Sequence, residues 1–403
     1  MTLARIVTKS LRQHALSTVV TAFGIALATG LLMAVWAVKT QANQTFTGVS
    51  GGFDAVLGAR SAKLQLVLNA IFHLEESPGN LGQADFEEIR KNPAVALALP
   101  IAVGDNYRGY RLVGTTTNLF TEVEPQPQRK GQKFVFTSGR AFNAGYAEAV
   151  LGSFAANRLG LKLGDKFHPY HGLLFDEKQQ HAETYVVTGI LAPSNTPADR
   201  VIWIPLEGVQ NMQGHAAHTA NEISAVLVKL RSPIVGKQLE TLYNKQGNRL
   251  TFAWPIAQTI AQIFDKIAWF DRVLELVAWL VAAVATASIL ASLYNSMNER
   301  RREIAILRAL GAHRSTIFGA VVIESAAIAA IGAFAGFLVY GAIAIGAAAI
   351  IRAQVGVVLD PWAWNLVFLW APAGIIASGA AAGIVPALKA YRTDVAENLV
   401  PHS

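Results

Sequence analysis

Long uncharged runs of apolar residues occur at four places in this sequence. Residues 15–38 carry no charged side chain, and the next uncharged run begins after Glu275. A third run covers residues 315–351 with Glu324 as its one charge, and a fourth covers residues 361–388. An α-helix rises about 1.5 Å per residue, so roughly 20 apolar residues cross roughly 30 Å of hydrocarbon. The pattern therefore predicts four transmembrane helices.

Two of these runs have alternative interpretations. Residues 15–38 follow three basic residues as a signal peptide does, but they exceed the about 7–15 apolar residues of a signal core, which favours an uncleaved anchor. Residues 315–351 exceed one perpendicular span, so they form either a helix with an outer extension or a helix with a re-entrant tail. Gly341 and Gly346 favour a break in this run.

The segment between the first two spans has the pattern of a mixed α and β domain. Runs such as YRLVGT, KFVFTSG, ETYVVTGIL, RVIWIPL and ISAVLVKL are rich in β-branched and aromatic residues and predict strands. Residues 85–93 predict a short helix that stops at a proline, and residues 147–161 have helical spacing. Residues 54–68 form an apolar stretch that predicts either a surface for lipid or a partner, or a buried connection. The sequence predicts an α-helical membrane protein with a large α+β domain inserted between spans one and two.

A heptad pattern precedes the second span and runs directly into it. Its apolar positions are spaced alternately by four and three residues: Ile256, Ile260, Ile263, Ile267, Phe270 and Leu274. Such spacing is typical of a helical seam. We therefore expect one long helix over residues 256–297 whose outer half is a stalk that packs against an outward extension of span one. A purely structural helical hairpin is the alternative.

The segment between spans two and three is short and amphipathic. Basic and acidic residues alternate with apolar positions, and a glycine follows: Glu299, Arg300, Arg301, Arg302, Glu303, Ile304, Leu307, Arg308, Leu310 and Gly311. This composition predicts a helix on the membrane surface that stops at the glycine. It is either an interfacial helix alone or a docking helix for a cytoplasmic partner.

Lysine and arginine in the short segments set the orientation of the spans. Basic residues precede span one, lie between spans two and three, and follow span four, whereas only Arg352 lies between spans three and four. Because cytoplasmic segments carry the positive excess, both termini are predicted to be inside and the large domain outside.

Composition supports a membrane protein with a soluble insert. Only 15% of the 403 residues are charged and 52% are hydrophobic, whereas soluble proteins carry roughly 25% charged residues. Much of the net charge of +7 lies in the predicted cytoplasmic segments, where basic residues interact with anionic lipid, so no nucleic-acid partner is expected. The absence of cysteine excludes disulfides, thiolate metal sites and cysteine nucleophiles.

Histidines in the insert are candidate metal ligands. His168 and His171, and likewise His215 and His218, are spaced so that two imidazoles could share one metal ion. No third ligand is identifiable from the sequence, and surface histidines are the competing interpretation. Neither a G-x-S-x-G motif nor an H-E-x-x-H motif occurs, so no catalytic residue is assigned.

Several segments together resemble a known family, the permease subunits of the MacB/FtsX/LolC–LolE group of ABC transporters. MNERRREIAILRALGAHRSTIFGAVVIESA is similar to the family's coupling helix and the start of its third span. SLRQHALSTVVTAFGIALATGL is similar to its first span, and VLGSFAANRLGLKLGDKF and YVVTGILAPSNTPADRVIWIPLEGV to its periplasmic core domain. GIVPALKAYRTDVAENL is similar to its C-terminal end.

The resemblance implies a dimer of four-span permeases, homo- or heteromeric, in the bacterial inner membrane. Two ATPase domains on the cytoplasmic face would bind ATP and Mg²⁺ and drive motion of the periplasmic domain. This chain begins some 14 residues before its first span and has no G-x-x-x-x-G-K followed by Ser or Thr, so it binds no cofactor itself and a separate ATPase subunit is expected. A periplasmic adaptor or lipoprotein is left open as a further partner.

The resemblance also gives a use to the stalk, which would transmit motion to export or release a lipoprotein, peptide or amphiphile. A signalling scaffold without transport, and a zinc-linked transport component, are the alternatives. The expected organisation follows in chain order: interfacial segment 1–14, span one 15–38, MacB-like core domain 39–255, stalk and span two 256–297, coupling helix 298–315, span three with outer extension 316–351, span four 361–388 and cytoplasmic tail 389–403.

Two features inside the spans also suggest functions. Glu324 lies within the third apolar run, and it matches a glutamate of the family pattern. An intramembrane carboxylate is costly, and a hydrogen bond or ion pair near the coupling helix is favoured over a proton relay. Gly332 and Gly336, and the series Gly374, Ser378, Ala382 and Pro386, predict close helix packing within a protomer or across the dimer.

Overall fold

The computed structural model describes residues 3–48, 50–125, 131–212, 222–299, 301–355 and 359–391. The chain divides into two compact units. A helical unit contains residues 1–42, 267–350 and 359–403, and an α+β unit contains residues 43–266 and 351–358. The α+β unit is thus inserted between the first and second long helices, as predicted from the sequence.

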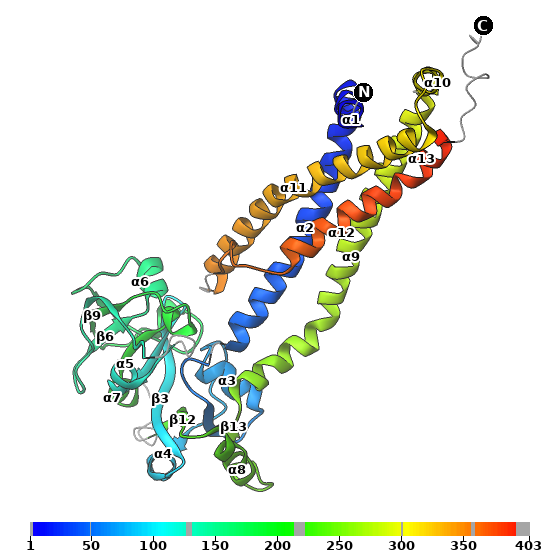
Figure 1. The fold of residues 1–403 in the computed structure, drawn as a ribbon. Helices are drawn as coiled ribbons and strands as arrows, with labels where there is room; N and C mark the ends of the chain where they lie inside the picture. Colours follow the sequence, from blue (N-terminus) through cyan, green and yellow to red (C-terminus); the bar gives the residue numbers. More distant parts are fainter. Residues whose placement is uncertain are drawn as a thin grey trace. The chain divides into compact units, whose positions relative to one another are not determined.

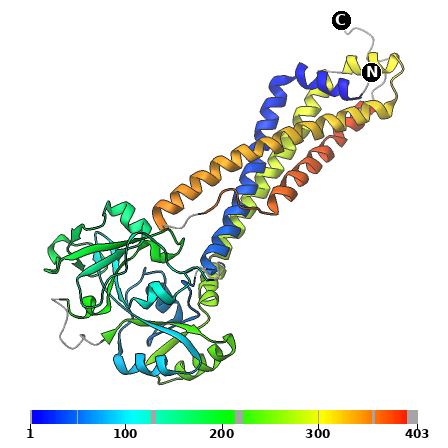
Figure 2. The same cartoon turned by 60° about the vertical axis from the view of Figure 1, so that its left-hand side comes forward.

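The helical unit contains the long apolar helices. Its elements are α1 (Leu3–Gln13), α2 (Ala15–Gly48), α9 (Ile256–Glu299), α10 (Arg301–Ala309), α11 (Arg314–Val355), α12 (Val367–Ala382) and α13 (Ile384–Tyr391). Helices α2, α9 and α11 also have residues in the α+β unit. Four stretches of the described residues are long and apolar enough to cross a membrane: Ala15–Gln41, Ala268–Asn295, Arg314–Arg352 and Val367–Lys389. This confirms the four predicted spans. Helices α2, α9, α11 and α12 run side by side in both views (Figures 1 and 2).

Small residues dominate the core between these four helices. Alanines of α2, α9 and α11 are buried, and larger side chains such as Ile25, Met33 and Ile289 fill the space between them. The indole of Trp370 meets Trp36 edge-on at 5.2 Å and stacks on Trp279 at 6.2 Å between ring centroids. Because small side chains let helix axes approach closely, van der Waals packing can hold such a bundle together in lipid.

The described residues of the α+β unit form an 11-stranded sheet in the order β13-β1-β12-β3-β4-β10-β6-β9-β5, with β7 paired to β9 and β8 to β3. A second, two-stranded sheet pairs β11 with β2. The strands are β1 (Ala55–Ala59), β2 (Leu81–Gly82), β3 (Val95–Tyr107), β4 (Tyr110–Thr115), β5 (Phe136–Gly139), β6 (Glu148–Leu151), β7 (Lys166–Phe167), β8 (Tyr170–His171), β9 (Tyr185–Leu191), β10 (Ile202–Pro205), β11 (Glu222–Ile223), β12 (Ala225–Leu230) and β13 (Leu250–Ala253).

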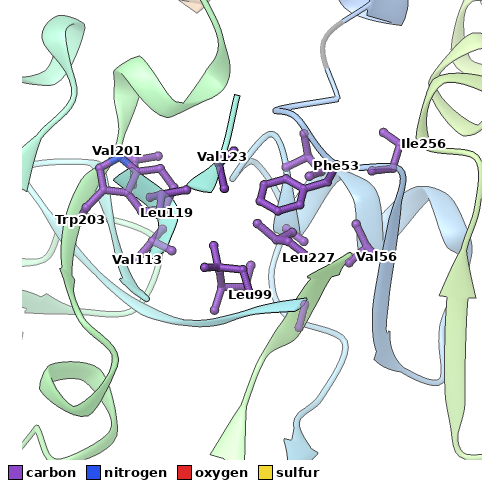
Figure 3. Close-up of a cluster of buried hydrophobic side chains, with 14 of the residues drawn as sticks. Phe53, Val56, Leu99, Val113, Leu119, Val123, Val201, Trp203, Leu227 and Ile256 are labelled. Carbon is purple, nitrogen blue, oxygen red and sulfur yellow. The ribbon is translucent and has the colours of Figure 1, made fainter. Parts of the chain in front are cut away.

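Strand β3 joins the two halves of this sheet. Its first half pairs with β12 and its second half pairs with β4, with a register shift between Val103 and Asp105. One hydrophobic cluster, which includes Leu99 of β3, collects side chains from both halves. Figure 3 shows Phe53 and Leu227 gathered near Ile256, the first residue of α9. The start of α9 is therefore part of the domain core.

Short helices cover the sheet and connect its strands. They are α3 (Lys63–Ala70), α4 (Gln83–Lys91), α5 (Asn118–Glu122), α6 (Ser153–Leu159), α7 (Leu206–Gln210), α8 (Pro233–Tyr243) and the 3₁₀ turns η1 (Glu177–Gln179) and η2 (Pro197–Arg200). Asp85 accepts a hydrogen bond from the Gly82 amide at 3.0 Å, which stabilises the start of α4. That helix ends before Pro93, as predicted.

Three sequence interpretations need correction or resolution. The predicted helix over 147–161 is wrong in its first part, because residues 148–151 form the buried strand β6 between β10 and β9 and only residues 153–159 are helical. Helix α11 continues through Gly341 and Gly346, since a glycine does not by itself interrupt a helix. Residues 54–68 contribute β1 and the start of α3, and the full burial of Val56, Leu57 and Leu66 favours the buried alternative over a surface for lipid or a partner.

Candidate functional site

The predicted coupling segment forms its own short helix, α10, between two long ones. Gly311 follows it with φ of 96°, a left-handed conformation that ends a helix and suits glycine. Arg308 is partly exposed, whereas Leu310 is 80% exposed. The remaining predicted coupling side chains lie outside the described part of the structure: Glu299, Arg300, Arg301, Arg302, Glu303 and Leu307.

One apolar side chain fixes α10 to the end of the helical unit. Ile304 is buried in a cluster with Ile317 and Val321 of α11 and Ala387 of α13. Through this cluster α10 contacts the long helix α11 and the short helix α13. Leu310, which directly follows α10, is by contrast an apolar side chain with most of its surface exposed.

Glu324 lies close to this end of the unit and is buried among the helices. The hydroxyl of Ser10 on α1 donates a hydrogen bond to its Oε1 atom. A hydrogen bond of this kind offsets part of the cost of burying a polar carboxyl group. The structure therefore brings the intramembrane acid together with the N-terminal amphipathic helix.

Gly332 and Gly336 lie where α11 touches α2. A Cβ atom on Gly332 would lie 2.6 Å from the Cβ of Ile25, and one on Gly336 would lie 2.8 Å from the Cβ of Thr29. These glycines therefore pack within the protomer. Close contacts with α11 are made by Gly379 of α12 and by Gly383, which follows α12. No atom lies within 4 Å of a Cβ on Gly374 from the predicted series.

The heptad seam occupies different environments along α9. Ile256 and Ile260 are buried in the core of the α+β unit. Phe270 and Leu274 are 50% and 37% exposed in the helical unit. The side chains of Ile263 and Ile267 lie outside the described part of the structure, so a seam that continues between these two pairs stays a prediction.

A cavity of about 530 Å³ opens in the α+β unit between α3, β4 and the loop after β8. Burial and the neighbouring charge of Arg111 lower the pKa of His73 to about 3, so its imidazole is neutral at physiological pH. Burial lowers the pKa of Arg111 to about 10, against the opposing effect of Glu76 and Glu75. Arg111 also donates a hydrogen bond to the backbone carbonyl of Glu75 at 2.5 Å.

This cavity presents both charges and an apolar wall. His73 meets the edge of the Trp203 ring at 5.7 Å between centroids, and Tyr110, Leu173 and Leu174 complete part of the lining. A guanidinium and a neutral imidazole beside carboxylates can bind a polar group of a ligand while the apolar wall covers its remainder. No local sequence pattern indicates this site, because its residues come from segments far apart in the chain.

The histidines do not form the pairs that their spacing in the sequence suggests. His168 Nδ1 lies 3.1 Å from the carbonyl oxygen of Glu183. His171 instead meets His181 and Asp105, and the ligand atoms of these three lie within 4.8 Å of one another. His215 and His218 lie outside the described residues. Sequence reasoning missed Asp105 and the pairing with His181, because strand register brings them together.

Comparison with protein families gives two matches that together cover most of the chain. Residues 15–242 match the MacB-like periplasmic core domain. Residues 275–395 match the FtsX-like permease C-terminal family. The second match includes α10, α11, α12 and α13, and the first includes α2 and most of the α+β unit.

The solved structures that are similar to this chain include two isolated domains. The periplasmic region of MacB from Actinobacillus actinomycetemcomitans is 15% identical, with a TM-score of 0.35 over 54% of this chain and 94% of that one. The extracellular domain of the noncanonic ABC-type transporter YknZ from Gram-positive bacteria is 14% identical, with a TM-score of 0.30 over 49% of this chain and 98% of that one.

Proposed function

The chain belongs to the MacB/FtsX-like family of ABC transporter permeases, and from this membership we propose that it is a membrane subunit driven by a separate cytoplasmic ATPase. The subunit transmits the motion of that ATPase to its periplasmic α+β unit. The motion exports or releases a periplasmic or membrane-embedded substrate such as a lipoprotein, a peptide or an amphiphile. A second permease copy completes the complex in the inner membrane.

The observation that carries this proposal is the environment of α10. The helix is anchored by buried Ile304 and leaves Leu310 80% exposed next to the glycine that ends it. An exposed leucine directly after a short polar helix, outside the spans, is suited to the apolar groove of a soluble partner. We propose that the ATPase binds the surface on which Leu310 is exposed.

The long helix α9 supports mechanical transmission. It is continuous from Ile256 to Glu299, about 66 Å at 1.5 Å per residue, and α10 follows it directly. Ile256 and Ile260 at its other end are buried in the α+β core. A displacement at the end near α10 therefore reaches residues fixed in the domain core without passing through a flexible linker.

Basic residues support the orientation. Arg12, Arg308, Arg314 and Lys389 all belong to the segments at the α1, α10 and α13 ends of the apolar helices. Because cytoplasmic segments carry an excess of positive charge, we infer that these ends, and both termini, lie inside the cell. The α+β unit is then periplasmic, which agrees with the kind of domain that its sequence matches.

The test is a docking experiment on α10 with a matched control. In Leu310→Asp the new charge must be desolvated in the groove of the ATPase, so co-purification of the ATPase with the full-length permease should fall at least about tenfold. Leu242→Asp makes the same change at a 49% exposed helical position in the α+β unit and should leave co-purification unchanged. Equal recovery with both variants would contradict docking on α10.

A signalling scaffold without transport is the alternative use of the same machinery, and a zinc-linked transport component is another. ATP-dependent release of a substrate from reconstituted vesicles distinguishes transport from the signalling scaffold. Release that requires ATP supports transport, whereas ATP turnover that alters only the activity of a periplasmic partner supports the scaffold.

A further inference from the structure

Three side chains with metal-binding atoms meet on one side of the α+β unit. They are Asp105 of β3, His171 of β8 and His181, which follows η1. The side chain of Asp105 is fully buried, that of His181 is 6% exposed and that of His171 is 50% exposed. Two of the three candidate ligands are thus buried, and the third, His171, borders solvent.

Backbone pairing fixes the positions of these residues. Asp105 stands directly opposite His171 in the antiparallel pairing of β3 with β8. The chain then turns through η1 and returns, because Gln180 forms a bridge with Tyr170 and the His181 amide donates to the Pro169 carbonyl at 2.9 Å. His181 is therefore held beside the strand that carries His171.

The amide side chain of Asn106 holds the same loop from the other side. Its Nδ2 atom donates to the carbonyl oxygen of Gly172 at 2.8 Å and approaches those of Tyr170 and Leu174 at 3.4 and 3.3 Å. The Gly172 amide donates to the Gly104 carbonyl at 2.9 Å. The three candidate ligands consequently sit on backbone that is fixed on both sides.

The two distances from the carboxylate of Asp105 are close to the edge length of a zinc tetrahedron. Oδ1 of Asp105 lies 3.1 Å from Nε2 of His181 and 3.4 Å from Nδ1 of His171. Ligand bonds of about 2.0–2.1 Å in tetrahedral geometry place neighbouring ligand atoms about 3.3–3.4 Å apart. One carboxylate oxygen is therefore spaced correctly from two imidazole nitrogens for a shared ion.

From this geometry we propose that Asp105, His171 and His181 form a mononuclear zinc site, with water at the fourth position on the half-exposed His171 side. Two imidazole nitrogens and a carboxylate oxygen favour Zn²⁺ over Mg²⁺ or Ca²⁺, which prefer oxygen ligands. The bound ion clamps the β8–η1 loop onto β3. The site lies within the α+β unit, and its existence does not depend on the proposed transport function.

A hydrogen-bonded histidine–carboxylate pair without metal is the competing explanation for the same contacts. The rings of His171 and His181 are nearly perpendicular, at 72°, with centroids 5.5 Å apart. A histidine–carboxylate pair needs only the buried His181 beside Asp105. Here the imidazole of His171, on β8, also approaches Oδ1 of Asp105. Removal of His171 therefore separates the two explanations.

The experiment titrates the full-length chain in lipid nanodiscs with zinc against a chelator of known affinity. The protein carries an affinity tag without histidine. Wild type should bind one zinc ion per chain, and Co²⁺ in its place should give the strong visible absorption of a four-coordinate ion. His171→Ala removes the most exposed ligand and should lower zinc affinity by more than the about 10–100-fold typical of a lost outer-shell contact.

His168→Ala is the matched control, because this histidine lies three residues before His171 and contacts a backbone carbonyl instead of the cluster. Its zinc affinity should equal that of wild type within about twofold. Asp105→Asn keeps the shape of the side chain, and zinc should raise the melting temperature of wild type but not of this variant.

Three results would overturn the proposal. The first is wild type that binds no stoichiometric zinc, and the second is a His168→Ala variant that loses as much affinity as His171→Ala. The third is zinc stabilisation that persists in Asp105→Asn. Folding of each variant is checked by its melting temperature without zinc, so a misfolded His171→Ala protein leaves the Asp105→Asn measurement to decide.

Discussion

The contact of α11 with α2 predicts that alanine substitutions at two glycines of α11 differ in their effect on the free energy of unfolding. In Gly332→Ala the new Cβ would lie 2.6 Å from the Cβ of Ile25 and 2.7 Å from the carbonyl oxygen of Ala22. Carbon atoms pack best at about 3.5–4.0 Å, so α2 and α11 must separate by about 1 Å. In the matched Gly346→Ala no atom lies within 4 Å of the new Cβ.

The magnitude follows from two opposing effects. Alanine is favoured over glycine inside a helix by about 1 kcal/mol, and both variants receive this gain. Overpacking of a close contact costs about 1–3 kcal/mol and applies only to Gly332→Ala. The free energy of unfolding of Gly332→Ala should therefore lie about 1–3 kcal/mol below that of Gly346→Ala.

The assay is reversible unfolding of the full-length chain in mixed micelles, followed by tryptophan fluorescence. Gly336→Ala serves as a second test, because its Cβ would lie 2.8 Å from the Cβ of Thr29. If Gly332→Ala and Gly336→Ala were both as stable as Gly346→Ala, the close packing of α2 on α11 would be refuted. These glycines would then be free to face another protomer.

Three further perturbations test other parts of the structure. Ser10→Ala removes a donor to buried Glu324, at a cost of about 1.5–3 kcal/mol, and should raise amide exchange in α1. Ile101→Ala, at a fully buried position, should cost about 2–5 kcal/mol by chemical denaturation, whereas Ile234→Ala, 78% exposed, should cost under about 0.5. The pKa of His73 is about 3 when folded and 6.5 when unfolded, so only the unfolded state binds this proton between those values. Stability should therefore fall as pH drops from 6.5 toward 3, and His73→Gln should remove that part of the dependence in unfolding measured at several pH values.

The membrane part of the fold was predictable because its signal is local. Uncharged runs of sufficient length predicted the four apolar helices, and the glycine at position 311 predicted the end of α10. Strand runs with β-branched residues gave β4, β9, β10 and β12. Each of these features depends on a single stretch of sequence and on few tertiary contacts.

The missed elements depend on partners distant in the chain. Strand β3 contains Pro100 and Gly104, which favour a turn, yet Pro100 pairs opposite Val226 and Gly104 lies at the register shift. The helical spacing over residues 147–161 included β6, where pairing with β9 and β10 overrides local preference.

The candidate sites divide in the same way. The coupling segment and Glu324 were identified from local sequence and from the family resemblance, whereas the partner of Glu324, Ser10, lies on a different helix. Spacing suggested His168 with His171, but strand pairing places Asp105 opposite His171 and brings His181 beside them. A sequence pattern of two histidines cannot show such a cross-strand ligand.

The most direct test of a permease driven by a separate ATPase is purification of the tagged full-length chain from its native membrane. Mass spectrometry should find an ABC ATPase subunit in stoichiometric amount, and the purified complex should hydrolyse ATP. Substitution of the Walker lysine in that subunit should abolish the hydrolysis. Recovery of the permease alone from intact, folded preparations, with no nucleotide turnover, would contradict the proposed function.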